Sequence, residues 1–316
     1  MRLVDACCAT RDWDALLGLA DRSRRAFERG RQLWPAASYA EYRLALDAPA
    51  AVAATVLTEG AARFAPGPVA EVVASTHSWA ELAPHVVDGP VAALCAHERV
   101  VRGEVVDSAT VAHAGVLAPP LALRPFEPEY LVAQYRTDRV EAPGPDPIHG
   151  RPLPAVEGWE AIDDPEVAEA LRDLVRPWTA QSEGRVRIAA VRGDAISAIA
   201  ALGVRAARGA WIDGAEALAR LAWAGASGGV HGRRRGAAAG RDRAWVAAAA
   251  FAGFAPDEPP DADALGAAIG ELRWLVWDAA DAGAGSGWVL RLAVEDPTEG
   301  LAWALDASDR GERPDA

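Results

Sequence analysis

The first 115 residues carry apolar side chains at the spacing of helix faces. The i, i+3, i+4, i+7 positions of one such face are Trp13, Leu16, Leu17 and Ala20. Ser38 and Ser78 are each followed three residues later by glutamate, a pattern typical of a capping box at a helix start. Prolines divide the region into segments of about one helix each. We therefore predict that residues 1–115 form a helical bundle or solenoid-like region, without strands from residue 10 onward.

The pattern changes over residues 116–160, which are rich in proline from Pro119 to Pro154. They contain one strand-like run, Tyr130 to Val140. Proline-rich segments between patterned regions are typical of linkers and ordered crossovers. We therefore place the boundary between two domains in residues 116–160.

Residues 161–316 mix the two periodicities. The predicted helices begin at Asp164-Pro165, at Asp194 (ending near Gly203), at Asp213 (through Ala226), near Arg233 (to about Phe254) and at Asp263 (to Glu271). The predicted strands are Arg185 to Arg192, Val204 to Ile212, Leu272 to Asp278 and Trp288 to Glu295. This order predicts an α+β fold, with a helical N-terminal half and a small mixed or antiparallel sheet in the C-terminal half.

The last two strands flank a Gly/Ala/Asp loop and are predicted to pair as an antiparallel hairpin. Alternation along the second strand places four side chains on its buried face: Trp288, Leu290, Leu292 and Val294. By the same alternation Trp274 and Trp277 point to opposite faces, which favours core packing over a shared stacking platform. Asp296-Pro297 predicts one further helix, carrying Trp303 and Leu305.

Charge and composition exclude several classes of function. The net charge is −13, which argues against nucleic acid and against a membrane as partners. All 32 basic residues are arginine, a composition typical of a GC-rich bacterium. Without lysine the chain has no Walker A loop, Schiff-base or pyridoxal-phosphate site, and it lacks the lysine of a standard protein kinase.

Cysteine usage and hydropathy predict a cytoplasmic, soluble protein. The three cysteines, Cys7, Cys8 and Cys95, form no CxxC motif, and buried or inert thiols are expected in a reducing compartment. The start of the chain lacks the apolar region of a signal peptide. The longest apolar run, residues 244–254, is too short to span a bilayer.

The candidate site is a glycine- and arginine-rich segment, residues 228–235, which we call the cationic turn. The window 217–256 around it holds six arginines and one aspartate, a charge of +5, so the rest of the chain carries −18. Candidate anion-binding residues are Gly229, His231, Gly232, Arg233, Arg234, Arg235 and Arg241.

Two interpretations of this segment remain open. In one, the segment binds an anion: its glycines let backbone amides approach the anion closely, and a helix starting near Arg233 directs its N-terminus at it. The arginines then bind the phosphate or carboxylate group with two hydrogen bonds each. In the other, the arginines pair with the chain's own excess carboxylates. The partner is accordingly either an acidic protein surface or a small anionic ligand, and no cofactor is predicted.

Other motifs lack the context that their chemistry requires. GASGG at 225–229 resembles a nucleophile elbow at Ser227, but a helix precedes it and the order of a triad fails. The histidine-containing cluster His77, His85, Cys95 and His97 matches no standard metal spacing, so no metal is predicted. Glu98, Glu104 and Asp107, or Asp163, Asp164 and Glu166, could form acid–base pairs, yet the sequence singles out none of them. The catalytic residues, if any exist, stay unknown.

Three segments, GRQLWP (30–35), HGRRRGAAAGR (231–241) and VEDPTEGLAWALD (294–306), resemble an uncharacterised family of actinobacterial proteins. That resemblance implies no activity. The sequence thus predicts a non-enzymatic binding or scaffold protein. The alternative is a small-molecule enzyme that acts on a phosphate- or carboxylate-bearing substrate.

Overall fold

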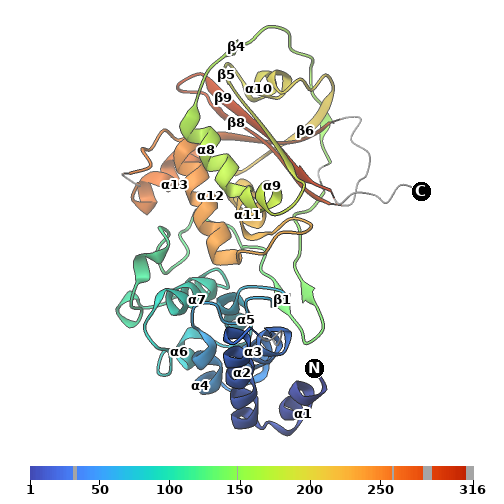
Figure 1. Cartoon of the computed structure of the whole chain (residues 1–316). Helices are drawn as coiled ribbons and strands as arrows, with labels where there is room; N and C mark the ends of the chain where they lie inside the picture. Colours follow the sequence, from blue (N-terminus) through green and yellow to red (C-terminus); the bar gives the residue numbers. More distant parts are fainter. Residues whose placement is uncertain (31–33, 148, 258–259, 280–286, 311–316) are drawn as a thin grey trace, which may run out of the picture. The chain divides into compact units, whose positions relative to one another are not determined.

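The computed structural model describes residues 1–30, 34–147, 149–257, 260–279 and 287–310, and the chain divides into two compact units (Figure 1). Unit 1 comprises Met1–Leu123, Leu131–Pro143 and Arg235–Ala238. Unit 2 comprises Arg124–Tyr130, Gly144–Arg234 and Ala239–Ala316. Parts of the proline-rich region 116–160 therefore belong to each unit. The division predicted above, into 1–115, 116–160 and 161–316, stays a prediction.

Unit 1 is built mainly from helices. Its α-helices are α1 (Arg2–Thr10), α2 (Trp13–Glu28), α3 (Trp34–Asp47), α4 (Ala50–Ala53), α5 (Val69–Thr76), α6 (Trp79–Leu82) and α7 (Pro90–Val100). Short 3-10 turns are η1 (Ala54–Val56), η2 (Ser108–Thr110) and η3 (Ala114–Val116), and a small hairpin joins β1 (Gln134–Tyr135) to β2 (Val140–Glu141). As predicted, the described residues between 10 and 115 contain no strand.

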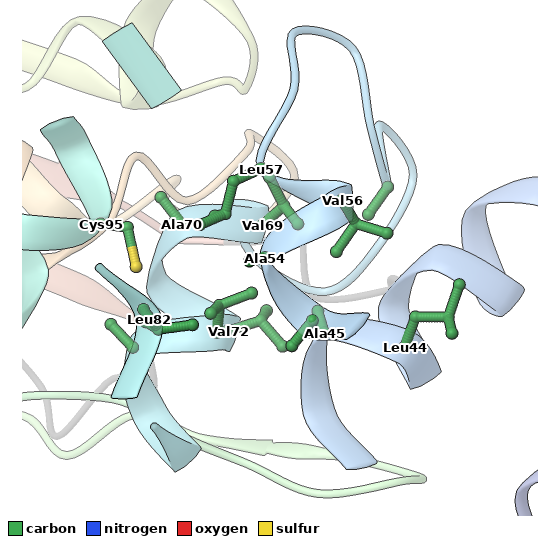
Figure 2. Close-up of a cluster of buried hydrophobic side chains, with 14 of the residues drawn as sticks. Leu44, Ala45, Ala54, Val56, Leu57, Val69, Ala70, Val72, Leu82 and Cys95 are labelled. Carbon is green, nitrogen blue, oxygen red and sulfur yellow. The ribbon is translucent and has the colours of Figure 1, made fainter. Parts of the chain in front are cut away.

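The core of unit 1 gathers around α3 and α5 (Figure 2). Leu44 and Ala45 of α3 pack in one cluster with Val69 and Val72 of α5. The predicted face of α2 is also confirmed, because Leu16 and Ala20 are buried. The capping box at Ser78 is present, with Glu81 as its acidic partner. The one predicted at Ser38 is wrong, because Ser38 lies inside α3 rather than at its start.

Unit 2 contains a seven-stranded antiparallel sheet in the order β3-β6-β7-β8-β9-β5-β4, which confirms the predicted α+β fold. Its strands are β3 (Arg151–Pro152), β4 (Glu160–Ala161), β5 (Arg185–Arg192), β6 (Ala207–Ile212), β7 (Arg273–Ala279), β8 (Trp288–Asp296) and β9 (Leu301–Asp309). Its helices are α8 (Pro165–Leu174), α9 (Arg176–Ala180), α10 (Ala195–Ala201), α11 (Gly214–Ala226), α12 (Ala237–Phe251) and α13 (Ala262–Glu271). The first two residues of α12, Ala237 and Ala238, are assigned to unit 1 and the rest of the helix to unit 2.

The predicted hairpin is confirmed by the antiparallel pairing of β7 with β8. Leu290, Leu292 and Val294 are buried, and Trp288 is half-buried. The predicted last helix is wrong, because Leu301–Asp309 forms β9 between β8 and β5. Asp296 accepts hydrogen bonds from the N–H groups of Thr298 and Glu299, and this turn leads into a strand instead of a helix.

The two faces of the sheet are covered by different helices (Figure 1). On one face Trp277 packs in a cluster with Ala198 and Ile199 of α10. On the other, Trp274 and Trp303 contact Phe251 of α12. Trp274 and Trp277 therefore lie on opposite faces, as predicted. Among the helices that the structure describes, none combines the length and apolar character needed to cross a membrane.

Candidate functional site

The cationic turn links α11 to α12. α11 ends at Ala226 with Ser227 as its C-cap, and α12 begins at Ala237. The helix therefore starts later than the predicted position near Arg233, and Arg233 precedes it instead of occupying its first turn. The turn belongs to unit 2 as far as Arg234, while Arg235 belongs to unit 1.

Side chains of unit 2 bind the backbone of the cationic turn. The N–H of Val230 donates to Oδ2 of Asp309 at 2.6 Å, and the N–H of Arg233 donates to Oε1 of Gln181 at 2.9 Å. Asp309 is 1% exposed and also accepts a hydrogen bond of 3.0 Å from the hydroxyl of Ser182. The sequence analysis proposed that these backbone amides bind an outside anion. In the structure they donate to oxygen atoms of the protein itself.

The glycines of the turn serve its internal packing. A Cβ at Gly228 would overlap the carbonyl of Gly232, and a Cβ at Gly232 would overlap the carbonyl of Gly228. Gly229 has a φ of +71°, and a Cβ there would overlap the carboxylate of Asp309. Close approach of backbone to backbone and to Asp309 therefore explains these glycines without an outside ligand.

The side chains of the turn differ in exposure. His231 and Arg233 are exposed, and Val230 is 37% exposed. Arg234 is half-buried in unit 2, and Arg235 is half-buried in unit 1. The outward-facing part of the turn in unit 2 is therefore a short stretch that combines an apolar, an imidazole and a guanidinium side chain.

Arg241, the remaining candidate, lies inside unit 2 and pairs with Glu127. The side chains are 1% and 0% exposed, and two guanidinium nitrogens donate to the carboxylate, each at 2.6 Å. The hydroxyl of Tyr130 and the indole of Trp245 donate to the same carboxylate. Burial raises the pKa of Glu127, but the hydrogen bonds and charge of Arg241 outweigh it and lower that pKa below its ordinary value.

Two further arginines of the window pair with acids of unit 2. Arg220 contacts Glu216 at 2.8 Å, and Arg243 contacts Asp173 at 2.8 Å. Together with Arg241, these arginines have their charge balanced within the protein. The positive field around the cationic turn is therefore weaker than the count of arginines indicates.

The N-terminus of α12, predicted to face an anion, meets two glutamates of unit 1. The N–H of Ala237 donates to Glu71 at 3.2 Å, and the N–H of Ala238 donates to Glu98 at 2.9 Å. No sequence pattern singled out Glu98 from the other acids, and the sequence analysis did not name Glu71. The one sequence signal of Glu71 is that it is a single acid inside the apolar run 69–74.

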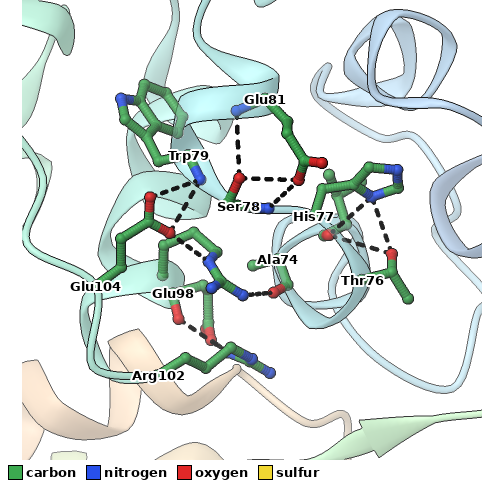
Figure 3. A network of polar contacts seen from close by, with 11 residues as sticks. Ala74, Thr76, His77, Ser78, Trp79, Glu81, Glu98, Arg102 and Glu104 are labelled. Carbon is green, nitrogen blue, oxygen red and sulfur yellow. Dashed lines mark hydrogen bonds and ion pairs between the residues drawn. The ribbon is translucent and has the colours of Figure 1, made fainter.

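The other sequence candidates make structural contacts. Nε2 of His77 donates to the carbonyl of Ala48 and Nε2 of His97 to that of Ala114, each at 2.9 Å. Figure 3 shows His77 beside the capping box of Ser78. His85 follows α6, and Cys95 is buried in α7. In the part of the chain that the structure describes, no group of three metal-ligating side chains is present.

The hydroxyl of Ser227, the candidate nucleophile, accepts a hydrogen bond of 2.7 Å from the indole of Trp178. It also accepts a longer one, 3.4 Å, from the N–H of Gly229. Ser227 is 1% exposed. GASGG therefore spans the end of α11 and the start of the loop that follows it.

Comparison with known proteins places the chain in a family. The model of a family of unknown function, DUF6183, matches residues 1–311, and the chain belongs to that family. No curated protein and no solved structure matches it. The predicted resemblance to a family without assigned activity is thereby confirmed, while an actinobacterial lineage stays a prediction.

Proposed function

We propose that this chain is a non-enzymatic binding protein and that its cationic turn docks an acidic segment of a partner protein. The observation that supports this most is the way unit 2 holds the turn. Asp309 and Gln181 fix its backbone, while Val230, His231 and Arg233 lie outward. A surface fixed before binding loses less conformational entropy when the partner arrives. Arginine binds carboxylates in a two-pronged geometry.

An acidic protein segment fits this arrangement better than a small anion. A small anion at a glycine-rich turn is bound by converging backbone N–H groups. Here the N–H groups of Val230 and Arg233 are engaged, and the carboxylate of Asp309 already lies against the turn. The turn presents exposed side chains instead of backbone N–H groups, and these suit a partner that contacts several of them at once.

The candidate residues divide into two roles in this proposal. His231, Arg233 and Arg234 contact the partner. Gly229, Gly232 and Arg241 hold the fold around the turn, and Arg235 belongs to unit 1. The acidic remainder of the chain repels an acidic partner elsewhere and so favours its approach at the turn. The three free thiols are compatible with this role in the cytoplasm.

The proposal is tested by thermal unfolding with an octaglutamate peptide or with inorganic phosphate. A ligand that binds only the folded state raises Tm by mass action. We expect the peptide to raise Tm, and the double variant Arg233→Glu, Arg234→Glu to lose that shift while it stays folded. The matched control is Arg192→Glu, an exposed arginine of β5, which should keep the shift.

Two outcomes would overturn the proposal. If phosphate raises Tm and the peptide does not, the turn is a small-anion site, as the enzyme alternative requires. If neither probe acts on the wild type, the turn has no ligand of this class.

A further inference from the structure

Strand β5 of unit 2 has an open edge along most of its length. β4, the end strand of the sheet, pairs with only the last two residues of β5, and the N–H of Ile162 adds one bond to the carbonyl of Ala190. The chain then turns into α8, which Asp164 caps. On its other side β5 pairs with β9 along its whole length (Figure 1). In the described part of the chain, residues 185–189 therefore have a neighbouring strand on one side only.

The hydrogen-bonding groups of this edge belong to Val186 and Ile188. Successive residues of an antiparallel strand turn their N–H and C=O groups to alternate sides. Ala190 bonds towards β4, so Ile188 and Val186 point the same way, whereas Arg187 bonds towards β9. Among the residues that the structure describes, none makes a hydrogen bond to the N–H or C=O of Val186 or Ile188. Such edge groups are a template for one further strand.

A row of alternating charge crosses the sheet and ends at this edge. Asp306 of β9 lies between Arg291 of β8 and Arg187 of β5, and it pairs with both. The Nε of Arg291 lies 2.8 Å from the carboxylate, and the Nε of Arg187 lies 3.2 Å from it. The side chain of Arg187 is 54% exposed. The row thus runs positive, negative, positive, and its last member is an accessible cation at the open edge.

These charges favour an acidic strand over a second copy of the chain. Directly opposite residues of an antiparallel pair lie on the same face, and like charges there are destabilising. If two β5 edges paired so that Val186 of each met Ile188 of the other, Arg187 would lie opposite Arg187. An acid at that position would instead continue the alternation of the row. Arginine at the edge therefore disfavours self-pairing and favours a carboxylate.

The opposite face of the edge favours apolar residues. Ile188 pairs in register with Leu305 of β9, which is buried, and Val186 lies on the same face as Ile188. A strand added here would place side chains beside Val186 and Ile188 on this face, and beside Arg185 and Arg187 on the charged face. The complementary strand therefore alternates apolar and acidic residues.

We propose that the β5 edge at residues 185–189 docks an extended segment of a partner protein in which acidic and apolar residues alternate. The segment adds a strand to the sheet of unit 2. Its backbone bonds to Val186 and Ile188, and one of its carboxylates pairs with Arg187. In such complexes main-chain hydrogen bonds provide affinity, and alternate side chains provide specificity. The site does not depend on the function proposed for the cationic turn.

Fluorescence anisotropy with labelled peptides tests the chemistry of the partner. We expect the peptide VEVEVEV to bind the wild type saturably, with an affinity that falls as salt is added, and VKVKVKV not to bind. Arg233→Glu changes the cationic turn and leaves β5 intact, so it should bind VEVEVEV as the wild type does. The two proposals can thus fail separately. No binding of VEVEVEV at low salt, or equal binding of both peptides, would overturn the present one.

The variant Val186→Pro tests the backbone of the edge. It removes an outward N–H and places a ring on the edge, while it removes no hydrogen bond to β9. We expect it to bind VEVEVEV at least about tenfold more weakly. The matched control is Val186→Ala, which shortens the same side chain, keeps the N–H and should retain most of the binding. Equal binding by Val186→Pro and the wild type would refute a docked strand.

Amide hydrogen exchange of the wild type keeps the test open if Val186→Pro does not fold. Bound VEVEVEV should slow exchange at Val186 and Ile188, because their N–H groups gain acceptors, and should change Arg187 little, since its N–H already faces β9. Bound peptide with unchanged exchange at Val186 and Ile188 would contradict the proposal. Sedimentation that shows a dimer of the wild type, with the same two amides protected, would assign the edge to a second copy and overturn it.

Discussion

The backbone N–H of Val230 donates a 2.6 Å hydrogen bond to the carboxylate of Asp309, the last residue of β9. This bond joins the cationic turn to the sheet of unit 2 across 79 positions of sequence. Hydrogen bonds to an ionised group are among the strong ones in proteins. The acid therefore binds the backbone of the turn, while the side chains of His231 and Arg233 are exposed.

Loss of this carboxylate should destabilise unit 2. Asp309→Ala leaves the donors of Val230 and Ser182 without their acceptor, which we expect to lower the free energy of unfolding by about 2–3 kcal/mol. Urea denaturation measures the change. The control Glu160→Gln, at a 70% exposed carboxylate, should change stability by less than about 0.5 kcal/mol. Equal stability of the two variants would contradict the anchoring role of Asp309.

A side chain at Gly229 should cost more than backbone strain alone. Gly203 has a similar φ, +82°, but open space around its missing Cβ, whereas a Cβ at Gly229 would overlap Asp309. We expect Gly203→Ala to cost about 1 kcal/mol and Gly229→Ala to cost clearly more, because the overlap must also be relieved. Chemical denaturation of both variants makes the comparison, and a smaller loss for Gly229→Ala would count against this packing.

Removing the guanidinium of Arg241 should unfold unit 2 more readily. Arg241→Met leaves Glu127 as an uncompensated buried charge, and we expect a loss of about 3–5 kcal/mol. Arg243→Ala, at a 40% exposed arginine, should cost at most about 1 kcal/mol. Denaturant midpoints report both values. A loss below about 1 kcal/mol for Arg241→Met would show that its ion pair contributes little to the fold.

The lowered pKa of Glu127 predicts how the free energy of unfolding changes at acidic pH. Its pKa is lowered in the folded state, so the unfolded chain binds more protons in acid. Its contribution is present above the ordinary value of 4.5 and is lost as pH falls through the folded value. Glu127→Gln should be less stable at pH 7, and the gap from the wild type should narrow towards pH 3. A gap independent of pH would refute this role.

Local sequence patterns predicted most elements of unit 2 but not every one. Alternation along 288–295 gave the hairpin, because side chains on one strand face follow a fixed period. Asp296-Pro297 predicted a helix start, because aspartate accepts hydrogen bonds from nearby N–H groups both at a helix N-terminus and in a turn. β9 pairs with its neighbour β8 across this turn and with the distant strand β5, and the pairing with β5 is long-range.

The candidate site shows the same limit. Glycine and arginine content located the cationic turn, yet its anchors Asp309 and Gln181 lie far away in sequence. A single acid in an apolar helix was the one local sign of Glu71. Which cations pair internally, as Arg241 does with Glu127, depends on contacts that no local spacing encodes.

The central claim, that the cationic turn binds an acidic partner segment, is tested most directly by fluorescence anisotropy. A labelled octaglutamate peptide is titrated with the wild type, with Arg233→Glu and with the control Arg192→Glu. We predict saturable binding that weakens as salt is added, that falls at least about tenfold in Arg233→Glu and that is unchanged in Arg192→Glu. Equal binding by all three proteins, or no binding by the wild type at low salt, would contradict the claim.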